Sequence, residues 1–235
     1  MLEQVTDIKT WKRWVLNLNN KSYYNFIDKK TIPLVFIHGV GLDHKMWSPQ
    51  INYFKNYSTI TYDLLGHGRT PFKKEKIKMQ DYIEQLLSII EFLKVEKINL
   101  VGFSIGSLIA LNFATDFQKK LNSLTLIATT YKRTEEQRQA VIDRVNLAKL
   151  NKPISQLAMK RWFTDEYLKK NPIIYDKFTK ILTKNGEDQK NFIKAYELFA
   201  HYKDDLEKIK KINTKTLVMT GSIDPGSTPE MSKKL

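Results

Sequence analysis

The chain has 235 residues, of which 42% are hydrophobic, and its 39 lysines and arginines against 25 acidic residues give a formal net charge of +14. A chain of this length and apolar content can bury one substantial core. Because no cysteine is present, disulfides, thiolate metal sites and a cysteine nucleophile are excluded. No apolar run reaches the roughly 18 residues that span a bilayer, and the N-terminus lacks the apolar stretch of a signal peptide. We therefore expect a cytoplasmic protein.

The distribution of the positive charge argues against nucleic acid and membranes as partners. Lysines are scattered through every segment, often beside acidic residues, as in residues 73–76 and 204–208. No block of five or six like charges and no interleaved aromatic stripe is present. We therefore expect a solvated, lysine-rich surface, with steering of an anionic substrate as the alternative. The sequence leaves the oligomeric state open.

Predicted strands and helices alternate along the first 130 residues. Apolar runs predict strands, the first two of which would form an opening hairpin, at residues 14–18, 23–26, 33–37, 58–62, 98–103, 121–128 and 214–220. The spacing of Ile83, Leu86 and Ile90 predicts a helix over residues 79–93. Strands that alternate with helices indicate an α/β fold whose mostly parallel sheet is covered by helices on both faces.

The segment from residue 131 to residue 211 interrupts this alternation. Its hydrophobic spacing predicts helices only, at residues 135–150, 154–169, 173–184 and 188–202. About eighty residues without a strand inside an α/β chain are typical of a helical cap inserted between two strands. We therefore divide the chain into a first part of the α/β core (1–130), a helical cap (131–211) and a second part of the core (212–235).

A serine between two glycines follows the strand predicted at 98–103. Residues 102–106 read Gly-Phe-Ser-Ile-Gly, and the helix-like segment 107–114 comes directly after them. Glycines two residues away on either side allow a strained strand-to-helix turn that lifts the serine hydroxyl above the sheet. This setting is typical of a nucleophile elbow, so Ser104 is the predicted nucleophile.

A glycine-containing loop, His38-Gly39-Val40-Gly41, follows the strand predicted at 33–37. Two backbone N–H groups are needed to hold the oxygen that becomes negative during acyl transfer. In this arrangement one belongs to the residue after the nucleophile and the other to a loop of this kind. We therefore assign the N–H groups of Ile105 and Val40 to an oxyanion hole. A plain glycine turn is the alternative for the loop.

Two aspartates follow predicted strands. Asp63 opens the sequence Asp-Leu-Leu-Gly-His-Gly, which we interpret as a structural turn in which Asp63 bonds local backbone, and His67 is therefore not the predicted base. Asp224 lies in Gly-Ser-Ile-Asp-Pro after the last predicted strand. The chain order of serine, then acid, then histidine favours Asp224 as the catalytic acid. An aspartate that only bonds its own turn is the alternative.

These motifs, in this order, resemble the α/β-hydrolase superfamily from about residue 31 to the last residue. The cap sequence 159–164 (Met-Lys-Arg-Trp-Phe-Thr) and the loop 221–229 are similar to those of 3-oxoadipate enol-lactonases and related esterases. The resemblance implies a serine hydrolase that cleaves a small-molecule ester or lactone and needs no metal or organic cofactor. Arg161 would bind the carboxylate of an acidic lactone, and Trp162 would wall the pocket. A surface arginine and a tryptophan in the core of the cap are the alternatives.

One member of the family's triad has no counterpart in this sequence. In the family a histidine follows the acid by a few tens of residues, whereas the four histidines here, His38, His44, His67 and His201, all precede Asp224. We expect the family's final strand and helix to be missing together with that histidine. The chain would then be nearly inactive. The strand at 214–220 would be an exposed sheet edge, with poor solubility as the result.

Other functions share these motifs. A general carboxylesterase, a thioesterase or a carbon–carbon bond hydrolase would use the same triad on a different acyl group. A non-catalytic homologue would use the pocket as a receptor for a ligand. Epoxide and haloalkane hydrolases of this fold are disfavoured, because an aspartate stands in them where this chain has Ser104.

Overall fold

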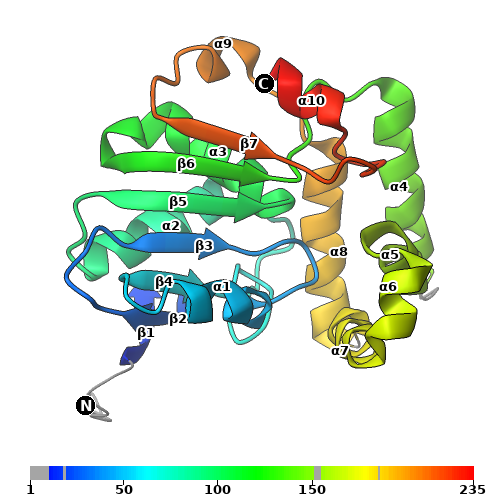
Figure 1. Ribbon diagram of the computed structural model, residues 1–235, viewed down its shortest axis with the longest axis horizontal. Helices are drawn as coiled ribbons and strands as arrows, with labels where there is room; N and C mark the ends of the chain where they lie inside the picture. The colour runs from blue at the N-terminus through cyan, green and yellow to red at the C-terminus, as the bar shows by residue number, and fades with distance from the viewer. Residues whose placement is uncertain (1–10, 18–19, 151–154, 185) are drawn as a thin grey trace.

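The computed structural model describes residues 11–17, 20–150, 155–184 and 186–235, and a seven-stranded sheet runs through this part of the chain (Figure 1). Its strand order is β1-β2-β4-β3-β5-β6-β7. The first two strands are antiparallel to their neighbours, and all pairs from β4 to β7 are parallel. The predicted mostly parallel sheet is therefore confirmed. The strands are β1 (Trp11–Asn17), β2 (Asn20–Ile27), β3 (Leu34–Ile37), β4 (Thr59–Tyr62), β5 (Ile98–Phe103), β6 (Leu121–Ile127) and β7 (Thr216–Met219).

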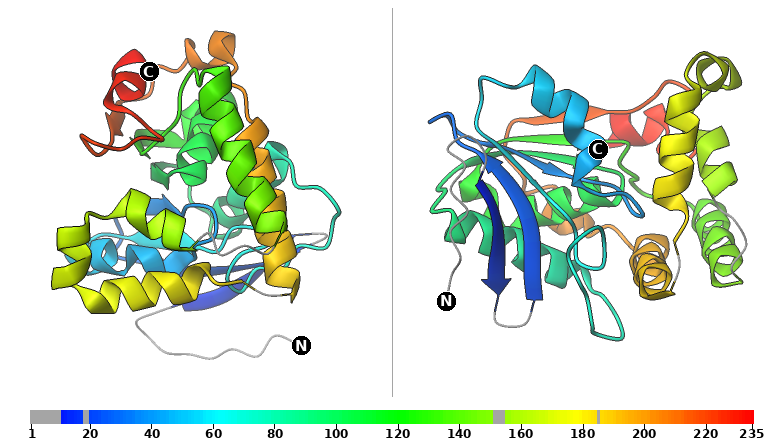
Figure 2. Two further views of the ribbon diagram at one scale, coloured as in Figure 1. Left: turned by 90° about the vertical axis from the view of Figure 1, so that its right-hand side faces the viewer. Right: turned by 90° about the horizontal axis from the view of Figure 1, so that it is seen from below.

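Helices cover both faces of the sheet and stand beyond its carboxyl end. The helices α2 (Met79–Phe92) and α3 (Ile105–Phe117) lie on one face, and α1 (Ser48–Tyr53) lies on the other (Figure 2). Past the arrowheads of the parallel strands stands a group of helices (Figure 1), namely α4 (Glu135–Lys149), α5 (Ser155–Trp162), α6 (Asp165–Lys170), α7 (Pro172–Leu182) and α8 (Gly186–His201). The shorter helices are η1 (His44–Trp47), η2 (Gln118–Lys120), α9 (Leu206–Ile209) and α10 (Pro229–Lys234).

Alternation along β3 explains why both faces are covered. Successive side chains of a strand point to opposite faces of its sheet. Val35 and Ile37 are fully buried in the main core, which α2 and α3 share. Phe36 between them points the other way and packs against Trp47 of η1, with 5.1 Å between ring centroids. Strands buried on both faces read as continuous apolar runs, as the segment 34–37 does.

Most predicted elements are present with shifted ends, but one predicted helix is wrong. The helix expected over 154–169 is two helices, α5 and α6, separated at residues 163–164. The Thr164 side chain accepts a hydrogen bond from the Tyr167 N–H and so begins a new helix. The opening hairpin is confirmed through the pairing of β1 with β2. Sequence periodicity missed α1, α9 and α10, which have six residues or fewer.

In the described part of the chain, β7 pairs with β6 alone and so forms an edge of the sheet. Leu217 and Met219 on this strand are 56% and 46% exposed. An exposed apolar edge strand is a template for pairing with another chain. Poor solubility from this edge stays a prediction, as do the boundaries of the cap at 131 and 211. Among the described residues, no helix combines the length and apolar character needed to cross a membrane.

Candidate active site

Ser104 occupies a strained turn between β5 and α3. Its φ is +56° and its ψ is −119°, a conformation that residues with a side chain rarely adopt. The two flanking glycines are sterically required. A Cβ at Gly102 would fall on the carbonyl oxygen of Gly106, and a Cβ at Gly106 would lie 2.5 Å from the carbonyl oxygen of Ile37. The turn therefore packs so tightly against β3 that side chains are excluded on both sides of the serine.

Hydrogen bonds from neighbouring elements hold this turn in place. The Ser104 N–H donates to the carbonyl of Ile127 at the end of β6, at 2.9 Å. The Ser107 hydroxyl and N–H both donate to the Ser104 carbonyl, at 2.5 and 2.9 Å. The half-buried Ser104 lines a pocket at the carboxyl end of the sheet. Because the surrounding backbone fixes the turn, the serine is presented to the pocket by the main chain itself.

The loop after β3 lies directly against the first turn of α3. A Cβ at Gly106 would also meet the His38 carbonyl oxygen, at 2.7 Å, so the two segments are in backbone contact. Val40 lines the pocket beside Ser104. Ile105, as the first residue of α3, has an N–H without an acceptor in a preceding turn. The structure thus places the two backbone segments predicted for the oxyanion hole side by side.

His38 pins this loop to the loop after β4. Its ring is fully buried, its Nδ1 donates to the Gly39 carbonyl at 2.8 Å, and its Nε2 accepts from the Leu64 N–H at 2.9 Å. Burial holds the pKa of His38 below its usual value despite the nearby charge of Asp63. The imidazole is therefore neutral, with both ring nitrogens engaged in structural bonds.

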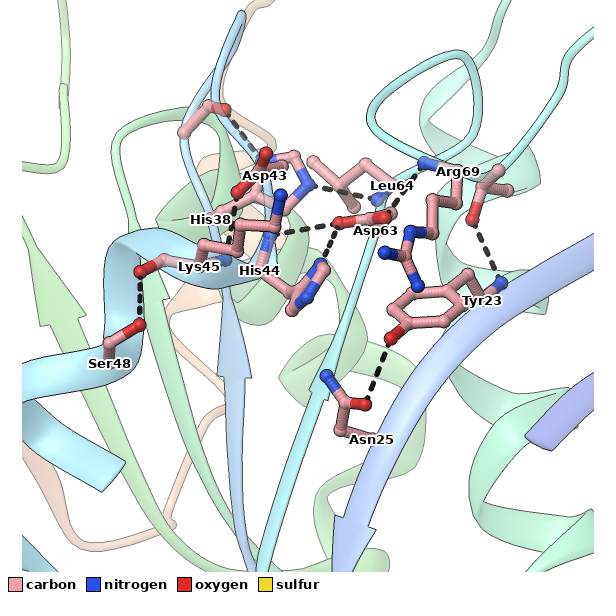
Figure 3. A network of polar contacts seen from close by, with 12 residues as sticks. Tyr23, Asn25, His38, Asp43, His44, Lys45, Ser48, Asp63, Leu64 and Arg69 are labelled. Carbon is pink, nitrogen blue, oxygen red and sulfur yellow. Dashed lines mark hydrogen bonds and ion pairs between the residues drawn. The ribbon is translucent and has the colours of Figure 1, made fainter. Parts of the chain in front are cut away.

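The buried carboxylate of Asp63, in the loop after β4, bonds His44 at the start of η1 and Arg69 in its own loop (Figure 3). Its Oδ1 accepts from the N–H and the Nδ1 of His44, at 2.9 and 2.7 Å, and its Oδ2 accepts from the Arg69 N–H at 2.8 Å. Burial alone would raise the Asp63 pKa, but the hydrogen bonds from the side chain and the N–H of His44 help to outweigh it, so the pKa is lowered. The predicted local bonding is only part of this arrangement. The bond to Arg69 is local, whereas the pairing with His44 spans nineteen residues and was missed.

None of the four histidines lines the pocket that contains Ser104. His44 bonds Asp63, and His38 bonds Gly39 and Leu64. His67 is buried, contacts the Leu65 carbonyl through Nδ1 at 3.1 Å, and has its pKa lowered by burial to about 3. His201 is exposed at the end of α8. The described residues therefore bring no imidazole to the serine.

Asp224 lies in the loop between β7 and α10 and lines the same pocket as Ser104. Its Oδ1 accepts from the N–H groups of Gly226 and Ser227, at 2.8 and 3.0 Å. The carboxylate therefore closes its own turn, as in the alternative considered from sequence, and also faces the cavity. Backbone bonds to Oδ1 fix the orientation of the carboxylate.

The pocket is a cavity of about 350 Å³ between the ends of the strands and the cap helices. Arg161 and Trp162, at the end of α5, both line it. Trp162 also packs edge-on against Phe178 of α7, with 6.1 Å between ring centroids, so it serves the cap core and the pocket wall together. A Cβ at Gly226 would come within 2.7 Å of the Arg161 Nη2, which places this guanidinium against the loop that carries Asp224.

Sequence reasoning missed several residues that line this cavity. They include Arg133, Arg144, Phe192, Tyr196 and Phe199. Their convergence depends on the packing of α4 against α8, which a single sequence does not reveal. One signal was available, since four of the six arginines fall between residues 133 and 161. No group of three or more histidine, aspartate or glutamate side chains arranged for a metal ion occurs in the described ranges.

A central parallel strand, a strained serine turn at its carboxyl end and helices that roof this end together define the architecture of the α/β hydrolases. The chain belongs to the alpha/beta hydrolase fold family, whose sequence model matches residues 32–235. It is 32% identical over 219 residues to (E)-2-((N-methylformamido)methylene)succinate hydrolase from Acinetobacter baylyi, an alignment that covers 91% of this chain and 81% of the relative.

Two further proteins are similar to this chain. It is 30% identical to 3-oxoadipate enol-lactonase 1 from the same organism, over 83% of this chain and 72% of the relative. The crystal structure of the enol-lactonase from Burkholderia xenovorans superposes with a TM-score of 0.84 at 19% identity, covering 94% of this chain and 86% of that chain. The structural likeness shows the fold alone. The predicted resemblance to α/β hydrolases that include enol-lactonases is confirmed.

Proposed function

We propose that this chain hydrolyses a carboxylic ester or lactone with Ser104 as the nucleophile. The observation that carries the proposal is the Ser104 backbone, held at φ +56° between glycines that have no room for a side chain. Strain of this kind persists only where the surrounding structure imposes it, and it is concentrated at functional sites. A structural serine at this position would gain nothing from the strain.

The reaction would follow the usual order of acyl transfer. A base takes the Ser104 proton, and the Ser104 Oγ attacks the carbonyl carbon of the substrate. The N–H groups of Val40 and Ile105 then stabilise the oxyanion, aided by the positive end of the α3 dipole. Asp224 would orient the base. For an enol-lactone, the leaving oxygen stays attached through the acyl chain as an enol that ketonises, and water then releases the acid from Ser104.

The substrate we propose is a small anionic lactone or ester. The reaction would take place in the cytoplasm and would need no cofactor. Arg161 supplies a guanidinium for a carboxylate, and Trp162 supplies an apolar wall. The names of the two curated relatives, a hydrolase of a substituted succinate and an enol-lactonase, support an acidic substrate. A lactone that resembles 3-oxoadipate enol-lactone fits both observations.

Because no histidine lines the pocket, we propose that the 235-residue chain turns over slowly on its own. Loss of one member of a serine–histidine pair costs about 10⁶ in turnover and leaves a residual 10³–10⁴ over water. The proposed reaction would then lack a proton acceptor beside Ser104.

Rescue by free imidazole tests this arrangement. Added imidazole should raise the hydrolysis of a carboxylated lactone in a saturable manner, and Ser104→Ala should abolish the rescue. Ser88, a partly exposed serine on α2 whose hydroxyl donates to the Glu84 carbonyl, offers a matched control. Ser88→Ala should respond to imidazole like the unmodified chain. Equal rescue of Ser104→Ala would reject Ser104 as the nucleophile. A panel with a neutral ester, a thioester and a vinylogous 1,5-diketone separates the lactonase from the esterase, thioesterase and carbon–carbon hydrolase alternatives.

A further inference from the structure

Arginine is concentrated at the pocket in a chain that otherwise uses lysine. The sequence has six arginines, Arg13, Arg69, Arg133, Arg138, Arg144 and Arg161, among 39 basic residues. Three of them, Arg133, Arg144 and Arg161, line the cavity that contains Ser104, and among the described residues no lysine lines it. Lysine would suffice for solubility, whereas the planar guanidinium matches the two oxygens of a carboxylate. The choice of arginine therefore points to a bound carboxylate.

Two of these arginines gather around Tyr196 of α8. The Arg144 Nε donates to the Tyr196 hydroxyl at 3.1 Å. Removal of its guanidinium from solvent lowers the pKa of Arg161, and the neighbouring charge of Arg144 lowers it further, although the residue as a whole remains exposed. Among the ion pairs of the described residues, none involves Arg144 or Arg161. The carboxylate of Asp224 attracts Arg161 without forming an ion pair with it, so the two neighbouring cations can still bind an anion.

Arg133 forms a second, separate site in the same cavity. Its Nη2 donates to the carbonyls of Phe199 and Tyr202, at 2.7 and 3.0 Å, and its guanidinium lies 5.0 Å from the Phe199 ring centroid. The residue is only 8% exposed, and its Nη1 is buried without a hydrogen-bond partner. Asp204 attracts this guanidinium but forms no ion pair with it among the described residues. A buried unpaired donor is costly, and a bound anion would satisfy it.

The two sites are close enough for one small molecule to reach both. Arg144 contacts Tyr196, and Arg133 contacts Phe199, three residues further along α8. The rings of Tyr196 and Phe199 lie side by side, with 6.4 Å between their centroids. That is comparable with the separation of two carboxylates on a short carbon chain.

We infer that the cavity is built for a dianionic substrate, with one carboxylate held by Arg144 and Arg161 and the second by Arg133. This inference rests on the proposed function in placing the reacting carbonyl at Ser104. It adds Arg133 and Arg144 to the residues that determine specificity. It also narrows the substrate to an ester or lactone that carries two free carboxylates besides the carbonyl that reacts at Ser104, one more than a lactone formed from a diacid retains.

Equilibrium binding of two matched acids tests the inference without any turnover. Calorimetric titration of the 235-residue chain with hexanedioate and with hexanoate compares two carboxylates with one on the same carbon chain. We expect hexanedioate to bind about tenfold more tightly or better. Arg144→Gln and Arg133→Gln should each remove this preference, while Lys160→Gln, which removes one charge from exposed α5 surface, should preserve it.

The binding measurements distinguish a dianion site from general attraction of acids to a basic surface. Equal affinity for the two acids, absence of hexanedioate binding, or an equal effect of Lys160→Gln and Arg144→Gln would overturn the inference. If Arg133→Gln fails to fold because its bonds to α8 are lost, Arg144→Gln still decides, since the Arg144 guanidinium bonds the Tyr196 side chain and no backbone carbonyl among the described residues. Retained preference for hexanedioate in a chain that hydrolyses no ester or lactone even with added imidazole would overturn the proposed function and support the dianion site.

Discussion

Replacement of Ser104 by glycine and by alanine measures the strain at the elbow. Both substitutions remove the hydroxyl, but only alanine keeps a Cβ at φ +56°. A residue held in such a sparsely populated region costs on the order of 1–3 kcal/mol. Glycine relieves this cost but loses about 0.5–1 kcal/mol through the greater freedom of the unfolded chain. We therefore expect Ser104→Gly to be more stable than Ser104→Ala by about 1 kcal/mol.

Thermal and urea unfolding provide the assay, and the neighbouring Ser107 provides the control. For a domain of this size, 1 kcal/mol corresponds to a Tm difference of about 2–4 °C. Ser107 is the third residue of α3, and both substitutions remove the same hydroxyl, so glycine there should be less stable than alanine by about 1 kcal/mol. The sign of the glycine–alanine difference should thus reverse between positions 104 and 107. The reasoning fails if Ser104→Ala is as stable as Ser104→Gly.

Four further predictions concern neighbouring features. In a thermal melting assay, Gly106→Ala should unfold several degrees lower than the unmodified chain, because its Cβ would meet backbone oxygens at 2.5 and 2.7 Å. Gly221→Ala is the control: its Cβ would meet nothing closer than 3.9 Å, so its Tm should match that of the unmodified chain. Arg161→Ala, in the presence of imidazole, should raise KM for a carboxylated lactone more than for a neutral ester, and equal increases would remove its carboxylate role. Burial lowers the pKa of His67 to about 3 in the folded protein, whereas its ordinary pKa is about 6.5. Below pH 6.5, His67 therefore binds a proton more readily in the unfolded state than in the folded state. Stability should therefore fall as pH drops from about 6.5 toward 3, and His67→Gln should fall less steeply; identical slopes in urea titrations at several pH values would contradict this. Leu217→Lys should leave unfolding unchanged and reduce light scattering on concentration, and undiminished scattering would show that the β7 edge does not drive association.

The sequence predicted those parts of the structure that depend on local sterics or on strong periodicity. The turn at Ser104 was predictable because glycines two residues before and after a serine, between an apolar run and a helix-like segment, permit this strained turn and are typical of it. The strand at 98–103 was predicted with its observed ends, since its mostly apolar sequence is typical of a central strand and ends at the glycine-flanked serine. The roles of Ser104, Asp224, Val40 and Ile105 stay predictions that the imidazole experiment addresses.

Features that depend on distant contacts could not be predicted in this way. The bond between His44 and Asp63 joins two loops that only the sheet brings together. The approach of Arg133 and Arg144 to the cavity depends on how α4 packs against α8. The break between α5 and α6 is different, because Thr164 followed by two acidic residues is a helix start signal that the apolar spacing obscured.

The cavity is lined partly by loops at the ends of strands and partly by helices of the cap, and the backbone is more tightly packed in the loops. Ser104, Val40 and Asp224 sit on loops at the ends of strands, where backbone packing leaves little freedom, whereas Arg144 and Arg161 project from cap helices. A substitution on the cap helices can change the charge and shape of the cavity wall while the strand-end loops keep their geometry. The set of ligands that the cavity accepts can therefore change gradually in evolution, or by laboratory redesign, through substitutions on α4 and α5 that bring different side chains to the cavity. The strand-end loops are the part to leave untouched.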